Sequence, residues 1–210
     1  MYNVYAFSIL VPTLIGIVRF NTIHKSYRLF IYLLLVTALN TFNYEFNDSL
    51  HAKHLVSHLL GVMELCFMFS LLLRWNNTRL SYKFKCLLKA ALIIFLCYGI
   101  YVVSGNVHAT NWPQLIVLTA LSVYAFGILV QQKTTQLSNA KAVPRKLIIF
   151  PFIISSIYFI SSKISLYFLY TPANDSFFIE LYSIAVIINL LSYICYSLAL
   201  QWAPKKEKYL

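Results

Sequence analysis

Two ionisable side chains interrupt long apolar stretches of the chain: Glu64 lies in the stretch 54–73 and Lys163 in the stretch 147–170. In a membrane, a charge near the bilayer centre costs at least about 2.5 kcal/mol on insertion scales, so both are candidates for function. A helical rise of about 1.5 Å per residue predicts Glu64 about 15 Å from the outer end of its stretch and Lys163 about 10 Å. Glu64 is then either protonated or paired with a cation. Lys163 either reaches it or extends its long side chain outward.

Three histidines at the start of the stretch 54–73 form a second candidate site. His51, His54 and His58 point within about 60° of one another on a helix, and Glu64 lies at least about 120° away from them. Neutral imidazoles one turn apart can chelate a divalent transition metal, and zinc takes three or four ligands. The residues available to complete such a site are Glu45, Asp48, Glu180 and His108. The alternatives are a pH-responsive outer surface and a plain structural role.

Further polar side chains accompany these residues. Asn40, Asn43 and Glu180 are predicted to form a polar cluster at the outer mouth, and Asn189 to join Glu64 and Lys163 in an intramembrane polar site. Serines are frequent in the stretch 147–170, at Ser155, Ser156, Ser161, Ser162 and Ser165. In membranes such groups usually join helices, each contributing about 0.6 kcal/mol, and the alternative is that they line a cavity.

The chain offers no complete catalytic set. A single intramembrane carboxyl group cannot act as both the general acid and the general base. The sequence also shows no nucleophile with a base beside it. The cysteines, Cys66, Cys86, Cys97 and Cys195, lie within or at the ends of apolar runs and form no C-x-x-C motif, which favours simple packing.

The elements that position these residues are seven apolar stretches: 5–20, 29–44, 54–73, 86–103, 112–131, 147–170 and 177–202. A crossing helix needs about 20 mostly apolar residues. The composition agrees, because 60% of residues are hydrophobic, 11% are charged and the mean hydropathy is +0.72. The sequence therefore predicts an all-α, multi-pass membrane protein, a single bundle of seven transmembrane helices over residues 1–210.

Fifteen of the seventeen lysines and arginines lie in four clusters, after alternate apolar stretches. The clusters are Arg19, Lys25 and Arg28; Arg74, Arg79, Lys83, Lys85 and Lys89; Lys133, Lys141, Arg145 and Lys146; and Lys205, Lys206 and Lys208. The other connections carry Glu45, Asp48, Asp175 and Glu180 but only Lys53 as a basic residue. The positive-inside rule predicts the N-terminus outside and the C-terminus in the cytoplasm. Trp75, Trp112 and Trp202 lie at predicted helix ends, as interfacial anchors do.

The net charge of +11 is explained by these clusters at helix ends, so we do not expect nucleic acid as a partner. The expected partners are membrane lipids, with anionic headgroups at the basic cytoplasmic connections. The longest connection, 132–146, is polar and basic, and we expect it to be flexible and to be where a protein partner binds. A homo-oligomer is the other assembly considered.

Three segments carry a resemblance: Tyr27-Arg28-Leu29-Phe30, the run from His58 through Glu64-Leu65, and the stretch around Asn189. Over nearly its whole length the chain resembles small seven-helix membrane proteins common in Bacteroidetes. The resemblance implies a bacterial cytoplasmic (inner) membrane location and a recurring glutamate at Glu64, but no activity. Seven helices also resemble microbial rhodopsins, but 177–202 contains no lysine to bind retinal.

These observations favour a non-enzymatic sensor, accessory or scaffold protein with a membrane-embedded polar site. The alternative is a small-solute transporter or channel, because Pro12 and Pro151 are expected to break their helices. A lipid-acting membrane enzyme is the third reading.

Overall fold

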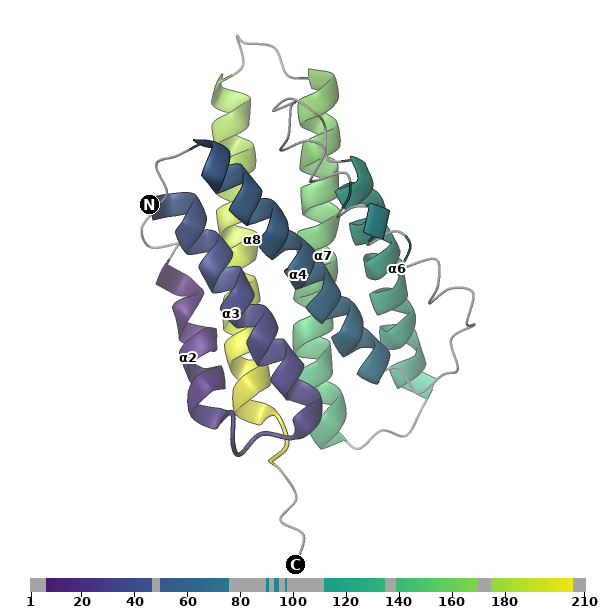
Figure 1. The fold of residues 1–210 in the computed structure, drawn as a ribbon. Helices are drawn as coiled ribbons and strands as arrows, with labels where there is room; N and C mark the ends of the chain where they lie inside the picture. The colour runs from purple at the N-terminus through teal and green to yellow at the C-terminus, as the bar shows by residue number, and fades with distance from the viewer. Residues whose placement is uncertain are drawn as a thin grey trace, which may run out of the picture.

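The computed structural model describes residues 7–46, 50–75, 112–134, 139–169 and 175–205, together with Ala90, Ile93, Ile94 and Cys97. The fold is all-α, and its only β pairing among these residues is one isolated bridge, Ile23 with Lys205. The six described helices carry the labels of Figure 1: α2 (Leu10–Arg19), α3 (Lys25–Phe46), α4 (Leu50–Trp75), α6 (Trp112–Thr134), α7 (Asn139–Leu169) and α8 (Asp175–Trp202).

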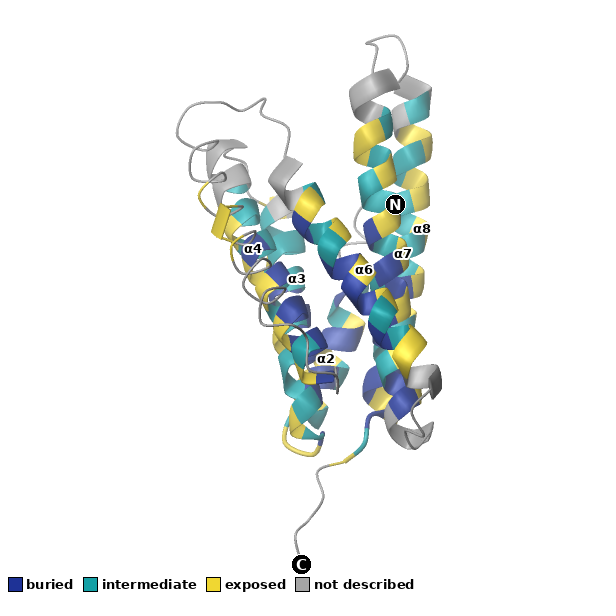
Figure 2. Cartoon of the chain, turned by 90° about the vertical axis from the view of Figure 1, so that its right-hand side faces the viewer, coloured by how far each residue is buried: buried dark blue, intermediate teal, exposed yellow. Residues whose placement is uncertain are grey.

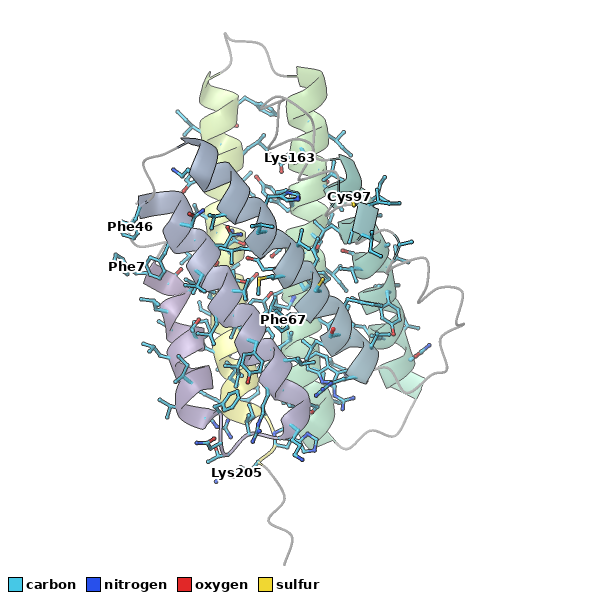
Figure 3. All side chains as sticks on the ribbon, in the orientation of Figure 1. Phe7, Phe46, Phe67, Cys97, Lys163 and Lys205 are labelled. Atoms are coloured by element: carbon cyan, nitrogen blue, oxygen red, sulfur yellow. The ribbon has the colours of Figure 1, made fainter. Side chains whose placement is uncertain are left out.

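The described helices form one bundle in which consecutive helices run in opposite directions, except α4 and α6, which run the same way (Figure 1). Helices α2, α4, α6 and α8 finish at the end where α3 and α7 begin. We call this the basic end, because the helix turns closest to it contain four arginines, Arg19, Arg28, Arg74 and Arg145. Figure 3 shows Lys205 at the basic end and Lys163 well towards the opposite end. Apart from Lys53 and Lys163, the described lysines and arginines belong to helix ends and connections on this side, as the sequence pattern predicted.

Most helices match the predicted stretches closely in position and extend beyond them at one or both ends, whereas α2 (Leu10–Arg19) is shorter than the predicted stretch 5–20. Helix α3 extends beyond 29–44 at both ends, and α4 beyond 54–73. Helix α7 begins at Asn139, so the second half of the expected flexible connection 132–146 is helical. Hydropathy marks where a helix enters the apolar layer, whereas backbone hydrogen bonding continues into polar turns outside it. The predicted stretch 86–103 lies almost entirely outside the described residues.

Three helical segments are long and apolar enough to cross a membrane, namely Val56–Trp75, Ala142–Ser165 and Ile179–Trp202. Leu10–Arg19 and Leu115–Gln131 are shorter apolar helices. Large apolar side chains lie on the outward faces, among them Val18, which is 80% exposed, and Val123, which is 67% exposed. Figure 2 shows such exposed positions along the outsides of the helices, around a buried interior. Lengths and faces together indicate association with a membrane.

Helix α2 is short and is held against α3 and α8 by a close approach at Gly16. A Cβ atom at Gly16 would lie 3.1 Å from two side-chain carbons of Ile31 and 3.5 Å from Leu200 Cδ1. Ile31 and Leu200 are both fully buried. The absence of a side chain at Gly16 therefore lets three helices meet near the basic end.

Arg19, the last residue of α2, closes the end of α8. Its guanidinium group donates hydrogen bonds to the carbonyl oxygens of Leu200 and Gln201, and to that of Ala203 at 3.2 Å. These carbonyls have no further turn of helix to bond to, and a cation there also suits the helix dipole. The backbone N–H of His24 donates to Pro204 O at 2.9 Å, so the connection between α2 and α3 holds the chain that follows α8.

Candidate functional site

Glu64 lies half-buried between α3 and α4, near the middle of the segment Val56–Trp75. With a rise of about 1.5 Å per residue, it is about 12 Å from Val56 and about 17 Å from Trp75. Asn40 Nδ2 on α3 donates a hydrogen bond of 3.1 Å to Glu64 Oε1. An amide N–H can donate to a carboxyl group in either protonation state. Asn40 therefore holds the side chain in place without fixing its charge.

Tyr196 on α8 is near enough for the charge of the Glu64 carboxyl group to act on its hydroxyl, although no hydrogen bond joins the two among the described residues. Its ring also packs edge-on against Phe30 of α3, with 5.1 Å between the ring centroids. On α8, Asn189, Ser192 and Tyr196 are spaced by three and four residues, so they share one helical face. The site thus draws on α3, α4 and α8, and polar groups continue from it along one face of α8.

The serines of α7 take part in this polar face to a limited extent. Ser155 Oγ lies 3.2 Å from Ser192 Oγ, so the two hydroxyls join α7 to α8. Ser192 Oγ also donates a hydrogen bond of 2.8 Å to the Ile188 carbonyl oxygen. Ser156 is buried, whereas Ser161 is exposed. At least one serine of α7, Ser155, therefore joins two helices, which is the usual role of serines in membrane helices.

Asn43, predicted at the outer mouth, joins α3 to α4 one turn further from the basic end than Asn40. Its Nδ2 donates to Ser57 Oγ at 3.0 Å and to the Lys53 carbonyl oxygen at 3.1 Å. Glu180, the third member of the predicted outer cluster, is exposed on α8. The structure thus places Asn40 with Glu64 in the intramembrane site and Asn43 at a helix–helix contact.

Lys163 extends away from Glu64. It is exposed on α7, and its Nζ lies 5.6 Å from the centre of the Phe159 ring on the same helix. Within the described residues no ion pair joins it to Glu64, whose hydrogen bond comes from Asn40. Of the two alternatives for Lys163, the ion pair with Glu64 does not occur among the described residues; its ammonium group lies over a ring one turn nearer the basic end, so the outward alternative stays a prediction. Asn189, the other predicted member, lies on α8 along the polar face described above.

The histidine stripe falls partly outside what the structure describes. His58 is half-buried on α4, while the side chains of His51 and His54 lie outside the described residues. Among the side chains that are described, no group of three histidines, cysteines or acidic residues is close enough to hold a metal ion. The metal site at His51, His54 and His58 therefore stays a prediction.

Sequence analysis missed Tyr196, because one tyrosine among sixteen carries no signal of its own. The available clue was spacing, since Tyr196 follows Asn189 by seven residues and so occupies the same helical face. Which face of α8 meets α3 and α4 depends on helix packing, and this could not be read from the chain.

Comparison of the chain with protein-family models, with curated proteins and with solved structures gave no match.

Proposed function

We propose that this chain is a non-enzymatic multi-pass membrane protein, a sensor or accessory subunit, and that the Glu64 site is its functional centre. The observation that carries the proposal is the hydrogen bond from Asn40 to Glu64 at 3.1 Å, in the middle of an apolar helix. A carboxyl group at this depth is costly, so a chain that keeps one there has a use for it. The hydrogen-bond partner of Glu64 is a neutral amide, so a proton on the Glu64 carboxyl group remains free to exchange.

The surroundings of Glu64 favour recognition over catalysis. Its hydrogen-bond partner is the Asn40 amide, and in the described part of the chain neither a second carboxylate nor an imidazole hydrogen-bonds to it. General acid–base catalysis needs a partner group that can take up the proton in turn. We propose that Glu64 exchanges its proton with a change in how α3, α4 and α8 pack, and that this change is what a partner protein detects.

We further propose seven transmembrane helices in a bacterial cytoplasmic membrane, with the N-terminus outside and the basic end in the cytoplasm. Helix α4 ends at the basic end while α6 begins at the opposite end, which supports one crossing between residues 76 and 111. Ala90, Ile93, Ile94 and Cys97, within the predicted stretch 86–103, are helical. The same topology accords with the resemblance to seven-helix proteins of Bacteroidetes type. The predicted partners, anionic lipid and a protein or second copy at the basic connections, remain part of the proposal.

The decisive experiment replaces Glu64 by Gln, which keeps the size of the side chain and an oxygen for Asn40 but removes the exchangeable proton. Hydrogen–deuterium exchange of the purified protein in nanodiscs would be compared at neutral and mildly acidic pH. We expect the wild type to change protection in α3 and α4 with pH, and Glu64→Gln to lose that change. The matched control is Glu180→Gln, an exposed glutamate on α8, which should respond like the wild type. If Glu180→Gln and Glu64→Gln lose the response equally, the proposal is wrong.

A transporter is the second candidate, and the polar face of α8 favours it, because Asn189, Ser192 and Tyr196 extend from Glu64 along one helix. Proton flux into liposomes, measured with an entrapped pH-sensitive dye, separates the two functions. Flux that requires Glu64 would replace the sensor proposal by the transporter. Liposomes that stay tight, together with a pH response of α3 and α4, would support the sensor.

A further inference from the structure

A second group of polar side chains lies at the basic end, remote from Glu64. Trp75, the last residue of α4, packs against Tyr27 in the first turn of α3, with 5.4 Å between ring centroids. The guanidinium carbon of Arg145 on α7 lies 5.8 Å from the centre of the Trp75 ring. Arg145 also hydrogen-bonds to the Tyr27 side chain. We call these residues, contributed by three helices, the Trp75 cluster.

Trp75 is placed differently from the other tryptophan at this end. It is only 2% exposed, whereas Trp202, the last residue of α8, is 57% exposed. An interfacial anchor lays its ring among the lipids and directs its N–H to water. Trp202 fits that description and Trp75 does not, because its ring is enclosed by Tyr27 and Arg145. The anchoring role expected from its position therefore does not account for Trp75.

The cluster contains hydrogen-bond donors without acceptors. Trp75 Nε1 and Arg145 Nε are both buried and have no partner among the described residues, and the same holds for Arg28 Nε, one residue after Tyr27. Buried donors in folded proteins are nearly always satisfied by protein, water or a bound ion. Neither an indole N–H nor a guanidinium N–H can act as an acceptor, so the missing partner has to be an acceptor.

The charge of the cluster shows what kind of acceptor it lacks. Arg145 brings a positive charge to the cluster, a second lies at the same end on Arg28, whose guanidinium carbon is 5.0 Å from the centre of the Phe20 ring, and no carboxylate in the described part of the chain lies at this end. The Tyr27 hydroxyl does not balance them, because burial raises the pKa of Tyr27 to about 12 in spite of the opposing effect of Arg145. Both arginines are only half-buried as whole residues, although their Nε atoms are buried. An anion would be favoured here.

We propose that the Trp75 cluster binds the phosphate group of an anionic phospholipid. Trp75 ends the segment Val56–Trp75, which places the cluster where an apolar helix leaves the membrane and phosphate groups are found. Arginine forks match phosphate oxygens, and basic sites between transmembrane helices are known to receive anionic headgroups. Two hydrogen-bond donors, Trp75 Nε1 on α4 and Arg145 Nε on α7, would then bind the phosphate oxygens. The proposal holds for either leaflet and does not depend on the role of Glu64.

The test is native mass spectrometry of the full chain after delipidation in detergent. Short-chain phosphatidylglycerol, phosphatidylcholine and inorganic phosphate are added in separate titrations. We expect phosphatidylglycerol to bind in preference to phosphatidylcholine. Arg145→Gln should weaken phosphatidylglycerol binding about tenfold, as expected for the loss of a charge-assisted hydrogen bond. Arg74→Gln removes the same charge from an exposed position next to Trp75, and should weaken it less than about twofold.

A second pair of variants isolates the indole donor. Trp75→Phe keeps an aromatic ring but removes Nε1–H, and should weaken phosphatidylglycerol binding about threefold, whereas Trp202→Phe should leave it unchanged. Glu64→Gln should also bind the lipid like the wild type, which separates this result from the test of the proposed function. Where Arg145→Gln does not elute as a monodisperse species, Arg145→Lys takes its place, because it keeps the charge and loses the fork.

Three outcomes would overturn the proposal. Equal losses in Arg74→Gln and Arg145→Gln would mean diffuse attraction of lipid to the basic end. Equal binding of phosphatidylcholine would mean that the acyl chains and not the charge are recognised. Displacement of the lipid by low concentrations of inorganic phosphate would assign the site to a free anion from solution.

Discussion

The type of partner that a polar side chain meets in the bundle decides what it can do. Glu64 receives its hydrogen bond from the Asn40 amide, while Lys163 lies over the ring of Phe159 on its own helix. An ion pair with Lys163 would have held the carboxyl group charged, whereas an amide partner accepts either form. A function based on proton exchange therefore depends on which of two residues, both visible in the sequence, is adjacent to Glu64.

At the residue scale, Tyr27 predicts a pH dependence of stability. Its pKa in the folded protein is raised from 10.0 to about 12, first because the side chain is buried. The folded state holds the phenol proton more tightly than the unfolded state, so this contribution is complete below about pH 10 and is lost as the pH rises towards about 12. The loss amounts to about 3 kcal/mol at most.

The measurement is the unfolding midpoint in detergent across this alkaline range. Tyr27→Phe should unfold with a visibly smaller dependence on pH than the wild type. Tyr32→Phe, at a 42% exposed position on the same helix, should keep the wild-type slope. Slopes that are the same in all three proteins would mean that the Tyr27 hydroxyl is not sheltered from water.

At the scale of elements, α2 shows how a short helix is fixed to two longer ones. It is only ten residues long, and it is positioned by the contact at Gly16 and by the bonds from Arg19 to the end of α8. Both features lie near the basic end, so α2 joins α3 and α8 where the polar connections meet. The arrangement couples the chain that follows α8 to the first described helix.

The close approach at Gly16 predicts an asymmetry between glycines. Gly16→Leu should destabilise the bundle by about 1–3 kcal/mol, because the fully buried Ile31 and Leu200 leave no room for the added atoms. Gly61 on α4 is the matched control, since a Cβ there meets nothing within 4 Å. Gly61→Leu should unfold at or above the wild-type temperature. A similar loss of thermal stability in both variants would show that α2 does not pack closely at Gly16.

At the scale of the whole molecule, the direction of the helices restricts the topology. Helices α4 and α6 both end at the basic end, and α6 is joined to α7 there by only residues 135–138. The proposed seven-helix topology therefore has one crossing between Trp75 and Trp112, and an odd number of crossings in all. The same arrangement accounts for the gathering of basic residues at alternate connections.

This topology is tested by reporters whose activity depends on compartment. A reporter fused after residue 75 should report the cytoplasm, and one fused after residue 111 the outside. Single cysteines introduced at positions 2 and 209 of a cysteine-free variant should react with an impermeant reagent in intact cells only at position 2. Reporters at 75 and 111 that respond from the same compartment would remove the seventh crossing and the proposed orientation with it.

The sequence by itself determined much about this chain. Hydropathy located the six described helices, and Trp75, Trp112 and Trp202 were correctly predicted at helix ends. Charge placement indicated that most basic residues share one end, and in the structure all the described ones except Lys53 and Lys163 do. These features depend on solvent, because apolar stretches partition into hydrocarbon and cations stay outside it whatever the packing. Glu64 was evident for the same reason, as an acid inside an apolar run.

Only the tertiary structure decided which residues meet. It placed the Asn40 amide on Glu64, left Lys163 over the Phe159 ring of its own helix, and enclosed Trp75 between Tyr27 and Arg145 instead of leaving it among the lipids. Each of these outcomes depends on how far a helix is rotated about its axis and on which neighbour it packs against. Interlocking side chains set that rotation, and small groups such as Gly16 decide where helices can approach. The hydropathy of a single sequence does not contain information on this rotation.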